Sequence, residues 1–392
     1  MSETDQPTPG VPAKPVPVLV PAPPAAPARA STRGSKRRTV GWVSLIAALA
    51  LALGMSFIPS PYVIEQPGPV FNTLGTSDHD GTQVPLISIS GATTYPTSGA
   101  LDMLTVSVVG SPESLPSWAE IVGAWFDQSR AVVPVASIYP PTVTVEQQDQ
   151  QNQAQMVNSQ QEAIAAALTK MGTAFTTTVS VAQVATDAPA TNILKAGDTI
   201  DSVNSVAVTS VDTLRAAVTA NGDAAPATLV ITRSGAQQTV QITPQKASDG
   251  TILLGIAAAA AYQFPFTVNI QLDNVGGPSA GMMFALGIID QLTPGDLTGG
   301  QKVAGTGTIS ADGTVGAIGG IRQKLYGAEQ SGATYFLAPA SNCDEVVGHV
   351  PSGLTVFAVS TLTDSITALT DISSGSDTGS PPTCDSVQAA TK

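Results

Sequence analysis

The sequence feature that most limits the possible folds of this chain is a glycine-rich turn followed directly by an apolar run. The stretch QLDNVGGPSAGMMFALGIID, residues 271–290, predicts a strand, a tight turn and a buried helix, with Ser279 at the junction. The first N–H groups of a helix lack intrahelical acceptors, so the amides from Gly277 to Ala280 are candidate donors to an oxyanion. Ser279 is therefore either a nucleophile or a plain helix N-cap in a turn of glycine and proline.

A nucleophilic serine needs a base, and histidine is the usual partner. The chain has only two histidines, His79 and His349, and neither lies in a comparable setting. The segment GGIRQK, further along the chain, places Lys324 in the first turns of a predicted helix. A lysine can act as the base where burial lowers its pKa and populates the neutral amine. The alternative is an ordinary surface lysine.

The N-terminal region combines a basic cluster with an uncharged run. The run Thr39–Ile58 carries no charge over twenty residues and follows STRGSKRR. Its length matches a bilayer core, so it predicts a transmembrane helix over 39–58. The positive-inside rule then puts a disordered tail, residues 1–38, in the cytoplasm and the rest of the chain outside it. A cleaved signal peptide is the alternative, because small residues lie near the end of the run.

The charge balance and the cysteines limit partners and cofactors. A net charge of −13, with no basic stripe beyond that cluster, argues against a nucleic-acid partner. Cys343 and Cys384 fit no zinc spacing; they are either a disulfide closing a loop of roughly 40 residues or two free thiols. His79 lies between two aspartates without distant partner ligands, which is a weak metal signal. No metal and no cofactor are expected.

Short strand-like pieces follow a polar helix that is predicted to end near Gly172. The stretch APATNILKAGDTIDSVNSVAV, a helix at VDTLRAAVTA and the hairpin LVITRSGAQQTVQITP resemble a bacterial PDZ domain over residues 173–248. The resemblance implies a module that binds an extended peptide along a sheet edge beside a helix. Its carboxylate-binding loop would lie near Met171 to Thr176.

The motifs GGPSAG, LTGG and GGIRQK together resemble the proteolytic domain of Lon proteases, which use a Ser-Lys dyad. The resemblance implies Ser279 as nucleophile, Lys324 as base and Thr298 as the residue that orients the lysine. Gly277 and Ala280 fall at the oxyanion and substrate backbone. The chain departs from the family at Gly276 and Gln323, where acidic residues are usual.

Weaker similarities upstream, in GALDMLTVSVVG and SQQEAIAAALTKMG, extend the resemblance towards residue 62. The expected fold is α+β: a single N-terminal transmembrane helix, then a Lon-type α/β proteolytic domain with an inserted β-rich PDZ domain. The protease would comprise residues 62–172 and 249–372, followed by a tail over 373–392. The family tends towards hexameric rings, so a homo-oligomer is possible by resemblance.

These features predict a membrane-anchored serine endopeptidase that acts on proteins or peptides outside the cytoplasm. No GxxxxGK[ST] phosphate loop occurs and no room remains for an ATPase domain, so cleavage should not need ATP. The main alternative is a non-catalytic PDZ adaptor whose Lon-like part is only a scaffold. A small-anion site at the GGPSAG turn is a further alternative.

Overall fold

The computed structural model describes residues 33–55, 58–375 and 381–391. The chain divides into two compact units, Met1–Met55 and Ser56–Lys392. In the first unit the described part is one helix, α1 (Arg33–Met55).

The predicted transmembrane helix over residues 39–58 is wrong. Within the described ranges, no helix combines the length and the apolar character that crossing a membrane requires. Four of the first six residues of α1 are Arg or Lys, which leaves the 17 residues Thr39–Met55 for an apolar segment. At about 1.5 Å per residue these reach about 25 Å, less than the ~30 Å hydrocarbon core. Residues 56 and 57 of the predicted span lie outside the described residues.

The predicted fold class and the predicted localisation are wrong for the same reason, because both included this transmembrane helix. The structure is mixed α/β, and single-pass anchoring, with a bilayer as partner and an N-terminus held in the cytoplasm, does not follow from it. The second unit contains two sheets of six strands, each with its own hydrophobic core.

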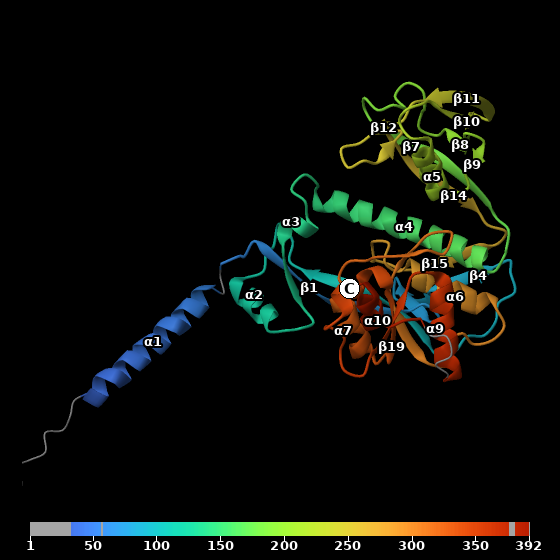
Figure 1. Ribbon diagram of the computed structural model, residues 1–392. Helices are drawn as coiled ribbons and strands as arrows, with labels where there is room; N and C mark the ends of the chain where they lie inside the picture. Colours follow the sequence, from blue (N-terminus) through green and yellow to red (C-terminus); the bar gives the residue numbers. More distant parts are fainter. Residues whose placement is uncertain (1–32, 56–57, 376–380, 392) are drawn as a thin grey trace, which may run out of the picture. The chain divides into compact units, whose positions relative to one another are not determined.

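A mixed six-stranded sheet is the centre of the Lon-like part (Figure 1). Its order is β20-β19-β16-β5-β1-β6; the first four strands run parallel, and β5, β1 and β6 pair antiparallel. The strands are β1 (Tyr62–Asn72), β5 (Ala100–Val109), β6 (Ala131–Pro134), β16 (Lys302–Gly305), β19 (Tyr335–Pro339) and β20 (Thr355–Val359).

Helices cover both faces of this sheet. Side chains alternate along the strands, so Val303 and Leu337 join one core cluster while Ala304 and Phe336 join another. The first core packs against α4 (Val145–Lys170), α6 (Gly281–Leu292) and α9 (Leu362–Ser374). The second packs against α7 (Ile321–Ser331), α8 (Cys343–Val346) and α10 (Cys384–Thr391).

Shorter elements complete this part of the unit. The hairpins and isolated pairs are β2 (Thr76–His79) with β3 (Thr82–Pro85), β4 (Ile87–Ser90) with β15 (Thr267–Ile270), and β17 (Thr308–Ile309) with β18 (Val315–Gly316). The short helices are α2 (Trp118–Trp125), α3 (Val135–Ile138) and the 3₁₀ turn Ala340–Asn342.

The PDZ-like segment lies between α4 and β15 in the chain. Its sheet has the order β11-β10-β8-β7-β14, with β9 beside β8, and packs on α5 (Val211–Asn221). The strands are β7 (Thr176–Val184), β8 (Thr199–Val203), β9 (Val206–Ala207), β10 (Ala227–Arg233), β11 (Ala236–Ile242) and β14 (Ile256–Gln263). A separate pair, β12 (Gln245–Lys246) and β13 (Ile252–Leu253), precedes β14. The sheet thus continues beyond the predicted boundary at residue 248.

A disulfide joins Cys343 at the start of α8 to Cys384 at the start of α10. Ala358 N–H of β20 also donates to the carbonyl of Pro382. Residues 381–391, which were predicted to be part of a tail, therefore include a helix held against the second core.

Removing this disulfide should destabilise the Lon-like part. The bridge spans 41 residues, so the double variant Cys343→Ser/Cys384→Ser should lose about 4 kcal/mol of unfolding free energy through the freed unfolded chain. Urea denaturation with and without reductant measures this. Reductant should lower the stability of the wild type but not that of the double variant; equal stability of all four samples would contradict a structural bridge.

Candidate functional site

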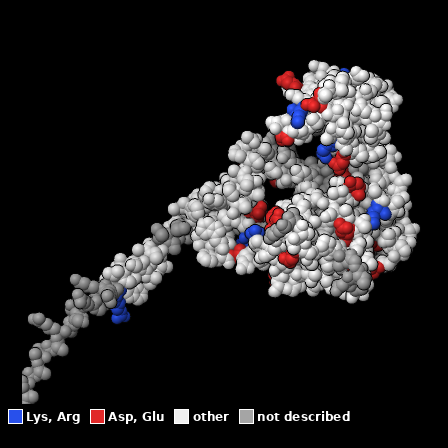
Figure 2. Space-filling model, viewed as in Figure 1, with Lys and Arg blue, Asp and Glu red and all other residues white. Residues whose placement is uncertain are grey.

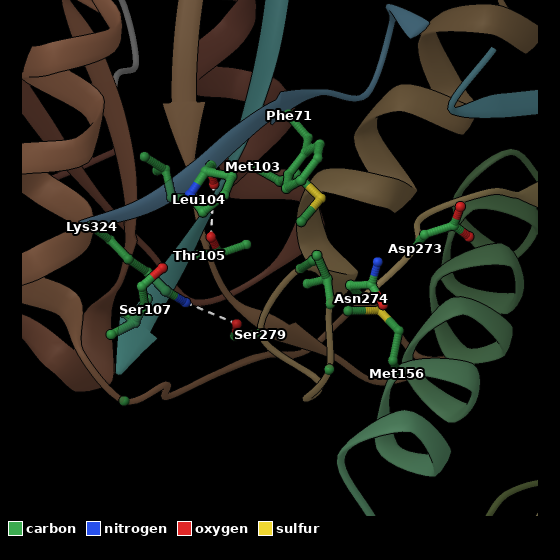
Figure 3. Close-up of a pocket in the computed structure, with 16 residues that line it drawn as sticks. Phe71, Met103, Leu104, Thr105, Ser107, Met156, Asp273, Asn274, Ser279 and Lys324 are labelled. Atoms are coloured by element: carbon green, nitrogen blue, oxygen red, sulfur yellow. Dashed lines mark hydrogen bonds between the residues drawn. The ribbon is translucent and has the colours of Figure 1, made fainter. Parts of the chain in front are cut away.

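Ser279 lies in the turn that precedes α6. The helix begins at Gly281 after Ala280, and no side chain caps it, so Ser279 does not serve as its N-cap. Its hydroxyl instead lines a pocket of about 520 Å³ between α4, β5 and the turn. In Figure 3 Ser279 lies between Lys324 on one side and Met156 and Asn274 on the other.

The two glycines of the turn allow close contact with α4. A Cβ on Gly276 would approach the Cβ of Asn152 to 2.7 Å. Gly277 has a φ of +85° and donates its N–H to the carbonyl of Asn152 at 2.8 Å. This contact explains why an acidic residue is absent at position 276. It also means that the N–H of Gly277, predicted as an oxyanion donor, already has an acceptor.

Lys324 extends from the first turns of α7 to the hydroxyl of Ser279. Its side chain is buried, with 2% exposed. The Nζ lies 2.8 Å from Ser279 Oγ (Figure 3). It also lies 2.9 Å from Thr306 Oγ1. Within the described part of the chain no carboxylate forms an ion pair with this amine. Burial therefore acts unopposed and lowers the pKa of Lys324 to about 7.

The threonine that contacts Lys324 is Thr306, not Thr298. Thr306 follows β16 and is fully buried; besides accepting from the amine, its Oγ1 donates to the carbonyl of Ser279 at 2.9 Å. Thr298 Oγ1 bonds to Ser98 O at 2.9 Å and Asp296 Oδ1 at 3.0 Å, so the structure does not bring it to the amine. Thr306 lies between two glycines at the end of a short buried strand, but in the sequence alone this pattern does not distinguish it from the threonine of LTGG.

Two backbone N–H groups beside the Ser279 hydroxyl have no acceptor among the described residues. The N–H groups of Ser279 and Ala280 donate no hydrogen bond there, and both residues line the pocket. The two available amides therefore belong to Ser279 and Ala280, and not to Gly277.

The pocket opens along an unpaired edge of β5. Strand β16 pairs with β5 only from Ala100 to Met103, while β1 covers the other side as far as Val109. Thr105 and Ser107 line the pocket beyond the end of β16. A larger hollow of about 1010 Å³ continues from it past Met156, Asp273 and Asn274.

Neither histidine bonds to Ser279 or Lys324, although His79 lines the larger hollow. His79 Nδ1 is 2.6 Å from Asp273 Oδ2, and this contact raises the pKa of His79. Within the described ranges no group of three or more potential metal ligands was found. On the face in Figure 2, basic side chains are few and scattered among acidic ones.

A second pocket, of about 550 Å³, lies between α5 and β14. Leu214, Val218, Leu254 and Ile256 line it with apolar side chains. The predicted carboxylate loop at Met171 to Thr176 does not line this pocket. The reason is that β7, which this loop precedes, is an interior strand, whereas β14 forms the edge beside α5.

Comparisons with known proteins bear on the part that contains Ser279 and Lys324. Residues 274–370 match the family described as Lon protease (S16) C-terminal proteolytic domain. Lon protease 2 of Herpetosiphon aurantiacus is 37% identical over 117 residues, which are 29% of this chain and 14% of that protein. Lon protease 1 of Sorangium cellulosum is 36% identical over 93 residues, 23% of this chain and 11% of that protein. The chain thus spans at most 14% of the length of these two relatives.

Solved PDZ domains are similar to another part. The PDZ domain of the SdrC-like protein of Listeria monocytogenes covers 20% of this chain and 85% of its own, with 22% identity and a TM-score of 0.20. The PDZ domain of the SdrC-like protein of Listeria innocua covers 21% of this chain and 92% of its own, with 22% identity and a TM-score of 0.20. The match to the Lon protease family covers the residues at the site, since it includes Ser279, Thr306 and Lys324. Residues 274–370 are therefore similar to the Lon protease (S16) C-terminal proteolytic domain.

Proposed function

We propose that this chain is a serine endopeptidase in which Ser279 is the nucleophile and Lys324 the general base. One observation carries the proposal: the buried amine lies 2.8 Å from Ser279 Oγ and has no carboxylate partner among the described residues. A pKa of about 7 leaves a large fraction of the amine neutral at physiological pH, so it can accept a proton. The substrates would be proteins or peptides.

The reaction would proceed through an acyl-enzyme. Ser279 Oγ attacks the peptide carbonyl carbon while its proton passes to the neutral Nζ of Lys324. The resulting ammonium then gives this proton to the leaving nitrogen, and the C–N bond breaks. In the second half a water molecule loses a proton to Lys324 and attacks the ester carbon; Ser279 leaves and recovers the proton.

Two sets of neighbours would support these steps. Thr306 Oγ1 accepts from Nζ at 2.9 Å and so directs the amine towards Ser279. The N–H groups of Ser279 and Ala280 would hold the negative oxygen of the tetrahedral intermediate, since neither has an acceptor among the described residues.

The open edge of β5 would hold the substrate. An extended peptide can pair with the backbone of residues 104–107, where β16 no longer covers this strand. Such pairing positions a scissile bond near Ser279, because Thr105, Ser107 and Ser279 line the same pocket. A peptide bound in this way must be extended and must enter the pocket beside Ser279, so flexible or unfolded segments would be cut first.

Two further parts of the proposal concern ATP and the PDZ-like segment. Cleavage at Ser279 would itself need no ATP, since the acyl-transfer steps given above consume only the peptide and water. The apolar pocket between α5 and β14 would bind an extended peptide along the open edge of β14. Leu253 to Ile256 would then form the loop at its end, with Gly255 at a φ of +75°.

Activity should depend on both Ser279 and Lys324. Turnover of fluorescein-labelled casein by the full chain at pH 8 should fall by about 10³-fold or more in Ser279→Ala and in Lys324→Met, because the two residues act as one unit. Lys170→Met removes an exposed lysine whose Nζ bonds to Thr363 Oγ1, and it should cleave like the wild type. A folded wild type without turnover, or variants that retain it, would contradict the proposal.

The two threonines offer a matched comparison. Thr306→Val and Thr298→Val each delete one buried hydroxyl with little change in volume, and each should cost about 1–3 kcal/mol of unfolding free energy. Only Thr306→Val should lower kcat, by about tenfold or more, because its hydroxyl contacts the amine. Steady-state kinetics and urea denaturation of both variants decide this; a selective loss of kcat in Thr298→Val would reverse the assignment.

A further inference from the structure

We infer that Ser159, on α4, is a positioning residue that orients one of the two N–H donors of the oxyanion hole. This inference rests on the proposed function and adds a residue to it. Ser159 is 119 residues away from Pro278 in the chain, yet its Oγ donates a hydrogen bond of 2.9 Å to the Pro278 carbonyl. Its side chain is buried, with 5% exposed.

The direction of this hydrogen bond determines the direction of the adjacent amide. A trans peptide unit is planar, and its C=O and N–H point to opposite sides; the described residues contain no cis peptide. Ser159 draws the carbonyl of Pro278 towards α4. The N–H of the same peptide unit belongs to Ser279, so it must point away from the Ser159 hydroxyl.

The next peptide unit is held in the same way. The carbonyl of Ser279 accepts from Thr306 Oγ1 at 2.9 Å and from Gly307 N–H at 2.9 Å. The N–H of that unit is the one of Ala280. Each N–H beside the nucleophile is therefore oriented through the carbonyl of its own peptide unit.

The two peptide units differ in how strongly hydrogen bonds hold their carbonyl groups. The carbonyl of Ser279 has two short hydrogen bonds. Among the described residues, the carbonyl of Pro278 accepts the bond from Ser159 and, beside it, only a long contact of 3.4 Å from Gly281 N–H. Removing the Ser159 hydroxyl leaves this long contact alone, and an N–H···O bond of that length is weak.

The surroundings keep the Ser159 hydroxyl in place. Helix α4 crosses α6 at Gly281, where an added Cβ would lie 2.7 Å from Ser159 Oγ and 2.7 Å from Ile309 Cγ2. The carbonyl of Asn152, two turns earlier on α4, accepts from Gly277 N–H at 2.8 Å. The turn is thus tied to one rigid helix at both ends, which suits a group that must not move as charge develops on the substrate oxygen.

Kinetics of the full chain can separate this role from simple packing. In Ser159→Ala, kcat on a peptide that the wild type cleaves should fall about 10- to 100-fold, because a misdirected donor no longer meets the oxyanion. KM should change by less than about twofold, since the donor contributes mainly in the transition state. The matched control is Ser365→Ala. It removes a fully buried hydroxyl that bonds to the carbonyl of Thr361, the N-cap residue of α9, and to Met282 Sδ on α6.

A second readout reports on the oxyanion directly. A peptide boronic acid adds to Ser279 Oγ to give a tetrahedral anion, with the serine proton passing to Lys324. Its affinity should fall in Ser159→Ala by about the same factor as kcat, whereas the affinity of the matching peptide amide, which forms no anion, should stay unchanged. Ser159→Cys keeps the size but donates weakly, so its kcat should lie between those of the wild type and Ser159→Ala.

The outcomes decide between the inference and the function on which it rests. Wild-type kcat and boronate affinity in a folded Ser159→Ala would overturn the role of Ser159 alone, as would an equal loss in Ser365→Ala. If Ser159→Ala does not fold, an unchanged kcat in Ser159→Cys would overturn it equally. A wild type that neither cleaves peptides nor binds the boronate would overturn the proposed function, and the inference with it.

Discussion

The buried amine of Lys324 is the constraint on which the site depends. Its neighbours are two hydroxyls, those of Ser279 and Thr306, and neither compensates a positive charge. Burial lowers the pKa of Lys324 from 10.5 to about 7. The folded state therefore holds fewer protons than the unfolded state between these values, and stability is lost as the pH falls through this window, by about 5 kcal/mol in total. The same burial leaves a largely neutral amine beside Ser279. The property that the proposed catalysis requires therefore lowers the stability of the fold.

Helix α4 holds the turn that carries Ser279, the proposed nucleophile. Its Asn152 carbonyl and its Ser159 hydroxyl bind the two sides of this turn before α6, and Met156 lines the pocket between them. The same helix leads directly into the PDZ-like segment. Glu162 of α4 accepts from Tyr262 of β14 at 2.6 Å and from the N–H of Ala311 at 2.7 Å. One helix therefore contacts the turn that carries Ser279 and the edge strand of the second sheet.

Much of this arrangement could be anticipated from the sequence, because local patterns carry it. The serine between a glycine turn and an apolar run, and the lysine of GGIRQK, stand out by their residue types and spacing. The position of Thr306 could not be read in this way: LTGG and AGTGT are equally plausible threonine sites until the pairing of β16 with β5 and β19 is known. Ser159 gives no signal at all, because it lies in a polar, glutamine-rich stretch and its partner is distant in the chain.

Two expectations failed for physical reasons that the sequence hides. The uncharged run after STRGSKRR has a suitable length on paper, but the helix includes the basic residues and offers too short an apolar segment. Gly277 was predicted as an oxyanion donor, but its N–H donates to the carbonyl of Asn152 on α4 instead. In both cases the residue types fit the predicted role, but the structural context around them, which the sequence does not show, prevents it.

The protonation state of Lys324 near neutral pH is the most direct test of whether this residue can act as the base for Ser279. The full chain, labelled with ¹³Cε lysine, can be titrated by NMR from pH 5 to 11, with the signal assigned by its absence in Lys324→Met. We expect the amine to titrate with a midpoint near 7, the value that burial gives it, and kcat/KM to rise with the same midpoint. A midpoint near the ordinary lysine value of 10.5 would mean an ammonium ion at neutral pH, and it would contradict Lys324 as the base.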